Sequence, residues 1–280
     1  MTVVELHSPD GKTHAAVQLD GIEPRDYAEL SDSLGASLER EELAYVAVSA
    51  AMRQAVERCP SANPADLWVH LIYHQFRNRF GRSDQSWKRV SGQALEHVVA
   101  TIYQSRLATH GIVLRPSTRA DAIALGLIKR GLGSAKTDLI LEASLAGELH
   151  LFGVIHCKAS IAERLTDDVP VSRVLMRKHI WSGIATMDAK MFPPPHGDGV
   201  VYGELGLSAR DKRRYFEIAG QFSGCYSFNL RTPASPAMTR SGKRIHSLGF
   251  AEPQPDVLVS DILAAWERFS RPMRQAGERP

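Results

Sequence analysis

The chain has 280 residues, of which 44% are hydrophobic and 23% are charged, and its formal net charge is +3. This length suffices for one large domain, or for one domain with a smaller lobe. No apolar run reaches the length of about 18 residues that a membrane-spanning helix needs, so the composition predicts a soluble globular protein without a membrane partner. The N-terminus lacks a basic region followed by an apolar one, so no secretory signal is expected.

The cysteines and the local charge indicate the compartment of the protein and its possible partners. Cys59, Cys157 and Cys225 are far apart and odd in number, which predicts a reducing compartment and no disulfide framework. The small net charge does not by itself indicate a nucleic-acid partner. The segment 77–92 (RNRFGRSDQSWKRVSG) is locally basic, and it is either a solvated surface or a DNA contact.

The first part of the chain predicts a small hairpin followed by helices. Residues 3–6 and 15–19 alternate in polarity around a Pro-Asp-Gly-Lys turn. Apolar residues recur at helical spacing over 27–58, and Asn63-Pro64 caps the next helix. Ser91-Gly92 then introduces a further helical segment, 93–107. Residues 1–85 are expected to form an N-terminal hairpin and helical part, joined in one compact unit to a core over 86–280.

The rest of the chain predicts a sheet with helices around it. Two strands come first, at 136–143 and 148–159, and a helix follows at 172–178. After it come a Pro-rich loop at 192–199, a basic patch at 209–214, a strand at 225–231 and a last helix at 257–269. These elements predict an α/β fold in which helices flank a mixed central sheet.

The two consecutive strands are predicted to pair as a hairpin, because Ala146-Gly147 is the turn signal between them. If the numbers of paired residues have an even sum, Asp138 lies opposite His156 or Lys158 and shares a face with both. An odd sum would place Asp138 and Lys158 on opposite faces. Either Lys158 lies at a harmless sheet edge, or its charge has a catalytic purpose.

An acid on one strand, a lysine at the end of the next and a helix before both resemble the layout of the PD-(D/E)xK nucleases. In such enzymes carboxylates hold Mg²⁺, and the lysine stabilises the nucleophile and the charge on phosphorus. The usual second acid, two residues before the lysine, is here His156. Glu96 on the preceding helix is the first candidate to replace it and Glu142 is the second, although a glutamate such as Glu96 can equally form a surface ion pair.

The segment 156–173 (HCKASIAERLTDDVPVSR), with SWKRVSGQALE, FPPPHGD, GELG and FNLRTP elsewhere, resembles type II restriction endonucleases of the AgeI and BsaWI kind. This group cuts palindromes with a CCGG centre, and the resemblance runs from NPADLW to NLRTP and is greatest to the AgeI branch. It implies a PD-(D/E)xK restriction-endonuclease-like core with Mg²⁺ as cofactor. It further implies a homodimer on double-stranded DNA, cleavage at A/CCGGT with a four-base 5′ overhang, a bacterial cytoplasmic location and a cognate DNA methyltransferase in the same system.

The resemblance places the catalytic residues on Glu96, Asp138 and Lys158, with Glu96 and Asp138 as metal ligands. It also indicates which residues read the DNA bases. Glu163-Arg164 matches the second half of a CCGG-reading element that follows the lysine in this group. An arginine donates to guanine and a carboxylate accepts from the cytosine amine.

The first arginine of that reading element is absent here. Ser160 lies in the stretch where it would stand, and Arg173 is a candidate to replace it; both are therefore candidate DNA contacts.

Other residues are expected to hold the DNA backbone. The stretch from Arg77 to Arg89, including Trp87, is a candidate clamp in which Lys88 and Arg89 contact phosphates. Lys136, in a Gly-rich basic loop, is a further candidate. Asp167 and Asp168 are expected either to hold the reading arginines in place or to cap a helix or turn.

Three functions remain compatible with these residues. The first is a sequence-specific restriction endonuclease, the second a structure-specific repair nuclease of the same fold, and the third a non-catalytic sequence-specific DNA-binding protein. The catalytic candidates do not separate the first two functions, whereas Glu163-Arg164 and the resemblance favour the first. The third requires that Asp138→Ala leave every activity intact.

Overall fold

The computed structural model describes residues 2–7, 14–40, 43–79, 84–130, 137–161, 165–189, 203–207, 211–250 and 256–277. Several sequence predictions fall outside these ranges: those on Lys136, Glu163, Arg164 and the Pro-rich loop 192–199.

The N-terminal part is a hairpin followed by helices that pack on one another. The predicted hairpin is confirmed, with Val4 opposite Val17 in an antiparallel pair. The helix predicted over 27–58 is two helices, because the chain leaves helical geometry after Glu39 and the second helix packs back against the first. The elements are β1 (Thr2–His7), β2 (His14–Leu19), α1 (Pro24–Glu39), α2 (Ala44–Arg58), α3 (Pro64–Asp66) and the π-helical segments η1 (Leu67–Tyr73) and η2 (Gln75–Arg79).

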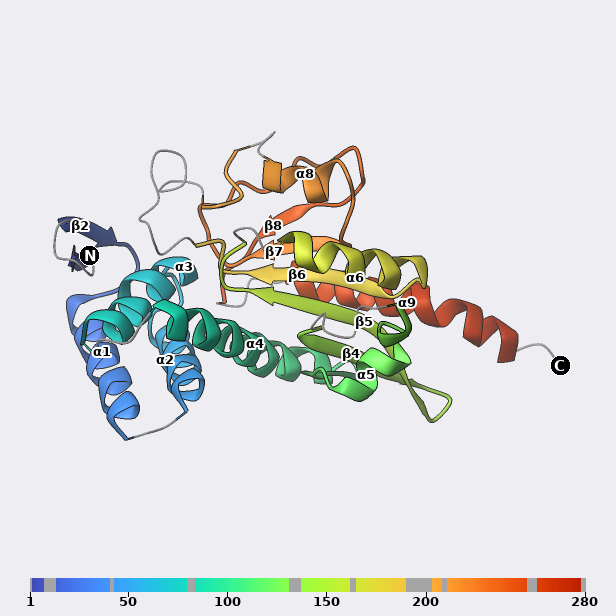
Figure 1. The fold of residues 1–280 in the computed structure, drawn as a ribbon, viewed down its shortest axis with the longest axis horizontal. Helices are drawn as coiled ribbons and strands as arrows, with labels where there is room; N and C mark the ends of the chain where they lie inside the picture. Colours follow the sequence, from blue (N-terminus) through green and yellow to red (C-terminus); the bar gives the residue numbers. More distant parts are fainter. Residues whose placement is uncertain are drawn as a thin grey trace.

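A mixed sheet forms the centre of the molecule (Figure 1). Its strands lie in the order β3 (Ile112–Pro116), β4 (Leu139–Leu145), β5 (Glu148–Lys158), β6 (Trp181–Thr186), β7 (Gly224–Ser227) and β8 (Ile245–Ser247). The pairs β3–β4 and β4–β5 are antiparallel, whereas β5 through β8 are parallel to one another. The prediction of an α/β fold with a mixed central sheet is therefore confirmed.

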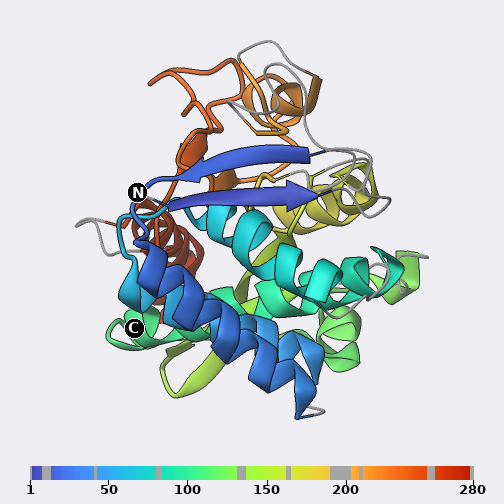
Figure 2. The same ribbon diagram turned by 90° about the vertical axis from the view of Figure 1, so that its left-hand side faces the viewer.

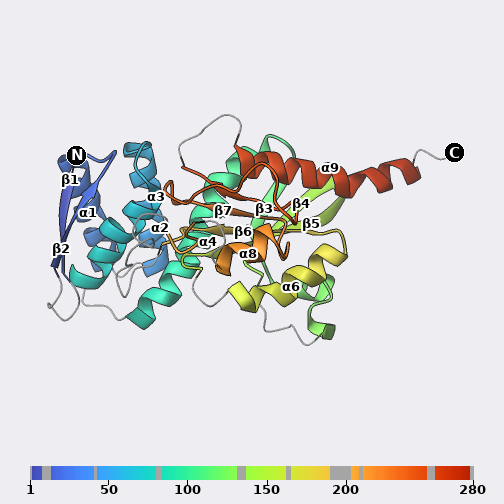
Figure 3. The same cartoon turned by 90° about the horizontal axis from the view of Figure 1, so that it is seen from above.

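Helices cover both faces of this sheet, and Figure 3 shows α9 and α6 on opposite sides of it. On one face Leu139 and Ile155 share a hydrophobic cluster with side chains of α4 and α9. On the other face Ile140 and Val154 cluster with side chains of α6. The helices of this part are α4 (Asp84–Ala108), α5 (Arg119–Ala124), the 3-10 turn η3 (Ile128–Arg130), α6 (Leu165–Arg177), α8 (Asp211–Glu217) and α9 (Val257–Gly277).

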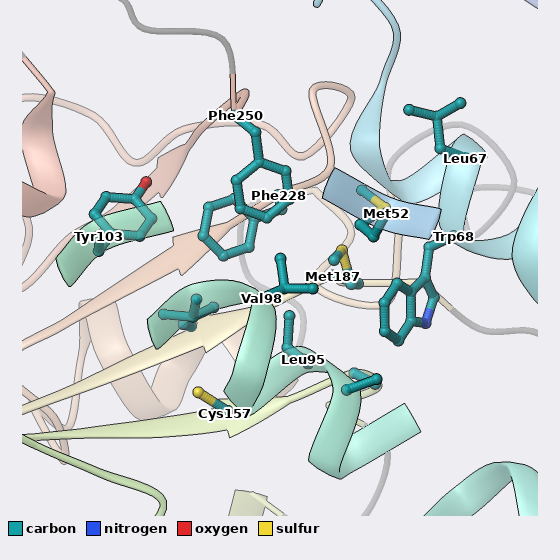
Figure 4. Close-up of a cluster of buried hydrophobic side chains, with 14 of the residues drawn as sticks. Met52, Leu67, Trp68, Leu95, Val98, Tyr103, Cys157, Met187, Phe228 and Phe250 are labelled. Carbon is teal, nitrogen blue, oxygen red and sulfur yellow. The ribbon is translucent and has the colours of Figure 1, made fainter. Parts of the chain in front are cut away.

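The N-terminal part and the sheet share one hydrophobic cluster. Figure 4 shows Met52 and Trp68 beside Met187, which follows β6. Polar contacts add to this packing, because Asn63 donates from Nδ2 to Asn229 Oδ1 at 3.0 Å. The boundary expected between residues 85 and 86 falls inside the first turn of α4, which packs on both α2 and β3. In Figure 2 the N-terminal hairpin and α1 face the viewer.

Candidate active site

A β-bulge sets which residues of the central hairpin share a face. At the turn, Leu145 lies opposite Glu148, so paired residue numbers have an odd sum. The register shifts between Leu141 and Glu142, and beyond the shift Leu141 lies opposite Gly153, which gives an even sum. The extra residue is Phe152, whose ring packs against Trp266 of α9 with ring centroids 5.1 Å apart.

The bulge brings the predicted acid and lysine to one face. With Leu139 opposite Ile155, the next position of the register places Asp138 opposite His156. Asp138 is held by two backbone contacts: its carbonyl accepts from the amide of Ser117 at 3.0 Å, and its Oδ2 accepts from the amide of Cys157 at 2.8 Å. The carboxylate of Asp138 therefore has a fixed position at the open end of the hairpin, where β4 begins and β5 ends.

Lys158 bridges two buried carboxylates at this point. Its Nζ lies 3.5 Å from Asp138 Oδ2 and 2.9 Å from Asp168 Oδ2. The lysine side chain is 16% exposed, against 4% for Asp138 and 9% for Asp168, so the amine lies at the mouth of the cluster and the acids lie deeper. The prediction that Asp138 and Lys158 meet is confirmed by these distances.

Asp168 was not expected in this cluster. It lies in the first turn of α6, which begins at Leu165 and covers the face that carries Val154 and Lys158. The signal that could have found it is helical spacing, because Leu165, Asp168, Val169 and Ser172 are all buried along one side of α6. An acid within the buried stripe of an amphipathic helix requires a partner, and here that partner is Lys158.

The electrostatics of the cluster favour a protonated lysine. Burial opposes the charge of Lys158, but the negative charges of Asp138 and Asp168 outweigh it and raise the pKa of the amine above its usual value. Two carboxylates and one ammonium leave a net negative charge at the site, which suits a divalent cation.

His156 stands two residues before Lys158, where the PD-(D/E)xK resemblance led us to expect an acid. It is fully buried, and burial lowers the pKa of its imidazole to about 4, so the ring is neutral near pH 7. Its Nε2 lies 3.1 Å from the hydroxyl of Ser182, and its ring packs edge-on against Phe222. His156 thus fills the space beside Asp138 without adding a negative charge.

The donor set fits a hard cation such as Mg²⁺. Asp138 and Asp168 supply carboxylate oxygens, and Mg²⁺ in proteins is commonly held by one or two carboxylates together with waters and substrate phosphate. Among the described residues no group of three or more His, Cys, Asp or Glu side chains is arranged to hold a metal. Any such cation would therefore rely on these two carboxylates and on non-protein oxygens unless a further acid joins them.

Comparison with known proteins identifies the family. The sequence is 41% identical over 252 residues to "Type II restriction enzyme AgeI" from Thalassovita gelatinovora, which covers 85% of this chain and 90% of the relative. The chain belongs to the AgeI family of type II restriction enzymes. A family model described as "BsaWI restriction endonuclease type 2" also matches residues 118–253.

The AgeI family also accounts for the fold. A crystal structure of the specific restriction endonuclease AgeI–DNA complex matches with a TM-score of 0.85 at 37% identity, over 94% of this chain and 99% of that one. The PD-(D/E)xK restriction-endonuclease-like core predicted from the sequence is confirmed. Of the three functions left open by the residues, the family supports a site-specific deoxyribonuclease.

The two alternative acids predicted for this AgeI-family site lie in different surroundings. Glu96 lies on α4, beside the buried Leu95, and α4 packs on the sheet face opposite to α6. Its side chain is partly exposed, and its role as a ligand stays a prediction. Glu142, the second choice, binds Arg115, with Oε1 2.6 Å from Nη2 and Oε2 2.8 Å from Nε, so this carboxylate is already committed to an ion pair.

Trp87 is not a DNA contact, and that part of the clamp prediction is wrong. Its side chain is 3% exposed, and its ring lies among Trp68, Tyr73 and Phe76 with centroids 5.1 to 5.7 Å away. This aromatic cluster anchors the start of α4. The two basic residues that follow Trp87 are exposed, so Lys88 and Arg89 remain available to a partner.

The remaining DNA candidates within the described residues make contacts of their own. Arg173, on the exposed side of α6, donates from Nε to Gln221 Oε1 at 2.5 Å. Ser160 donates from Oγ to Glu204 Oε2 at 2.9 Å. Their DNA-binding roles stay predictions.

No helix of the described part of the chain combines the length and the apolar character that crossing a bilayer demands.

Proposed function

We propose that the chain is a Mg²⁺-dependent endonuclease that cuts both strands of a palindrome with a CCGG centre. The expected site is A/CCGGT, cut to leave a four-base 5′ overhang, as the resemblance to the AgeI branch implies. The observation that carries the proposal is the convergence of Asp138, Lys158 and Asp168 at one end of the sheet, in a chain that aligns with AgeI over most of its length.

The residues of the site divide the chemistry between them. Asp138 and Asp168 would hold the cation, and Glu96 is a further candidate ligand. Mg²⁺ bound there would neutralise charge on the scissile phosphate and make a water molecule more acidic. Lys158 keeps its proton because both acids raise its pKa, so it donates hydrogen bonds to the attacking oxygen or to the phosphate.

His156 keeps this arrangement in place without titrating near pH 7. Its pKa of about 4 leaves the ring neutral, and Ser182 contacts the nitrogen that faces away from Asp168. A carboxylate at this position would add a further negative charge beside Asp138, within a fully buried environment.

Double-stranded DNA is the proposed partner. The solved AgeI relative is in complex with DNA and matches nearly the whole chain, which supports this assignment. Glu163 and Arg164 would read bases of the CCGG centre, with Ser160 and Arg173 beside them. Lys88, Arg89 and Lys136 would contact phosphates, which fix the position of the duplex but not its sequence.

A homodimer is proposed because a palindrome presents the same half-site twice, related by a two-fold axis. Each protomer would then cut one strand. Since the enzyme would act on any unprotected copy of its site, a cognate DNA methyltransferase in the same bacterial cytoplasm is the expected companion activity.

The direct test is digestion of unmethylated plasmid DNA of known sequence with the purified protein and Mg²⁺. Discrete fragments whose sequenced ends lie at A/CCGGT, produced with Mg²⁺ and absent with EDTA, are expected. Lys158→Met is the matched inactive control. A smear, or ends at sites without CCGG, would contradict the proposed specificity while leaving the family assignment intact.

A further inference from the structure

The segment that leaves the active site is tied to a residue more than forty positions away in the sequence. Ser160 and Ile161 follow Lys158 and lead directly to Glu163-Arg164 in the sequence. Ser160 donates from its hydroxyl to Glu204 Oε2 at 2.9 Å, and Ile161 donates from its amide to the same oxygen at 2.7 Å. One carboxylate oxygen therefore holds both the side chain and the backbone of this connection.

The second carboxylate oxygen of Glu204 forms an ion pair with a lysine of α8. Lys212 Nζ lies 3.4 Å from Glu204 Oε1, and the glutamate side chain is only 5% exposed. A buried carboxylate is costly unless it is paired and hydrogen-bonded, and Glu204 has both kinds of partner. Its charge is thus satisfied within the protein.

The turn that carries Glu204 is itself fixed to the sheet. Leu205 donates from its amide to Asp188 Oδ1 at 2.9 Å, and Asp188 lies two residues beyond the end of β6. Gly203 has a φ of 71°, and a Cβ at this position would collide with the carboxylate of Asp188. Glycine is therefore required for the turn to approach Asp188 so closely.

Apolar packing adds a second attachment on either side of Glu204. Ile161 and Leu205 are fully buried in one hydrophobic cluster that also contains Phe216 of α8 and Phe222. The connection from Lys158 and the turn at Glu204 are thus held together by charge, hydrogen bonds and apolar contact. The connection follows β5, and Asp188, which holds the Glu204 turn, follows β6. These two strands pair directly, with Lys158 opposite Thr186, so both segments start from neighbouring strands.

We propose that Glu204 is a positioning residue for sequence specificity. It holds the Ser160–Ile161 connection in one path, so that the residues reading the CCGG centre are aligned with the amine of Lys158. This inference rests on the proposed function, since it requires Glu163-Arg164 to read DNA. Glu204 would thereby couple base recognition to cleavage. When the bases of the CCGG centre are bound correctly, the scissile phosphate lies in the correct position at Lys158.

Two substitutions separate this role from a general structural one. Glu204→Asp keeps the charge but shortens the side chain by one methylene, which withdraws the acceptor from Ile161 and Ser160. Glu204→Gln removes the charge but keeps an amide oxygen that can accept from both. Lys212→Met is the control for loss of the ion pair alone.

The readout is kcat/KM on an A/CCGGT duplex divided by kcat/KM on a duplex with one altered base pair in the centre. Glu204→Asp is expected to lower this ratio by about tenfold, the size of effect that one or two lost hydrogen bonds produce. Glu204→Gln and Lys212→Met should stay within about threefold of the parent chain. Ser160→Ala, which removes the hydroxyl contact to Glu204, is a further variant. Thermal unfolding of every variant reports on folding.

An unchanged ratio for Glu204→Asp would overturn the inference, whether kcat/KM stays at the parent value or falls equally on both duplexes. If Glu204→Asp does not fold, the decision passes to Ser160→Ala, which must lower the ratio while leaving Mg²⁺-free binding to the A/CCGGT duplex, the measure of a direct DNA contact, unchanged. Failure of the parent protein to prefer A/CCGGT would instead overturn the proposed function, so the two failures are distinguishable.

Discussion

Lys158 Nζ lies closer to Asp168 on α6, at 2.9 Å, than to Asp138 before β4, at 3.5 Å. If Asp168 holds Mg²⁺ as proposed, Asp168→Asn should reduce cleavage by at least about 100-fold, because the loss of a metal ligand removes several kcal/mol of transition-state stabilisation. Binding to A/CCGGT in the absence of Mg²⁺ should be largely retained. Single-turnover cleavage and gel-shift titration measure the two effects.

The neighbouring Asp167 provides a matched control for this change, since it is exposed on the same turn of α6. Asp167→Asn should cleave at close to the parent rate. Equal losses for the two variants would show that the first turn of α6 matters for folding or DNA contact and not for metal binding.

Glu96 is tested by its effect on the Mg²⁺ requirement. If it is a ligand, Glu96→Gln should raise the Mg²⁺ concentration needed for half-maximal cleavage and slow the reaction by orders of magnitude. Thr101→Ala, an exposed position further along α4, is the control. Cleavage by Glu96→Gln at the parent rate would leave Asp138 and Asp168 as the metal-binding pair.

Arg164 is expected to read a base. Arg164→Ala should weaken binding to an A/CCGGT duplex by about 1–3 kcal/mol, the usual contribution of a bidentate contact to guanine, with little change on a scrambled duplex. Binding measured without Mg²⁺ isolates this step from cleavage. Equal weakening on both duplexes would make Arg164 a phosphate contact.

Lys88 and Arg89 are expected to act on affinity and not on sequence preference. They are exposed at the start of α4, directly after the buried Trp87. Replacing both with alanine should reduce the slope of log binding constant against log salt concentration by about 1 to 2, since each phosphate contact contributes about 0.9. Arg271→Ala, exposed on α9, serves as the control and should leave the slope unchanged.

Asp188 predicts a pH dependence of stability. Burial raises its pKa to about 7, against about 4 in an unfolded chain. Between these values the folded state holds a proton that the unfolded state has lost, so stability falls as pH rises from about 4 to about 7. Below this window the carboxyl group is protonated in both states and makes no difference.

Asp188→Asn cannot ionise and should lack this part of the pH dependence. The quantity to compare is the free energy of unfolding of the parent chain minus that of the variant. This difference should decrease by a few kcal/mol as the pH rises from 4 to 8, since each unit of pKa shift corresponds to roughly 1.4 kcal/mol. Urea unfolding at several pH values provides the difference. A pH-independent difference would show that Asp188 stays charged in the folded protein.

The sequence predicts the contact between Asp138 and Lys158 well because both residues lie on one hairpin. The alternation of apolar residues and a single turn signal are enough to bring Asp138 near Lys158. The bulge at Phe152 has no such signal, and the turn alone gives an odd register that would separate them. The pairing with an even sum of residue numbers is therefore found at the open end of the hairpin, whereas the pairing next to the turn has an odd sum.

Other parts of the fold could not be predicted for physical reasons. β6 is buried at every position, so it shows no alternation of polarity and resembles any short apolar run. The sequence does not place Asp168 on a helix, because Val169-Pro170 is a helix-breaking signal and the expected helix begins after it. In the structure α6 begins at Leu165 and continues through Pro170, so Asp168 faces the sheet.

The bulge at Phe152 also limits how this hairpin can change in length. Phe152 and Gly153 together lie opposite Leu141, so the arm of β5 contains one residue more than regular pairing with β4 would allow. Removing one residue from this arm of β5 would remove the bulge and keep Leu141 opposite Gly153, so Lys158 would stay on its face. Removing one residue from the arm of β4 between Glu142 and Leu145 would instead shift the register and exchange inward and outward positions along the rest of β5, unless β5 bulged by a second residue. Related enzymes are therefore expected to tolerate the loss of one residue from this arm of β5, whereas a one-residue loss from β4 should be accompanied by a compensating change before the lysine.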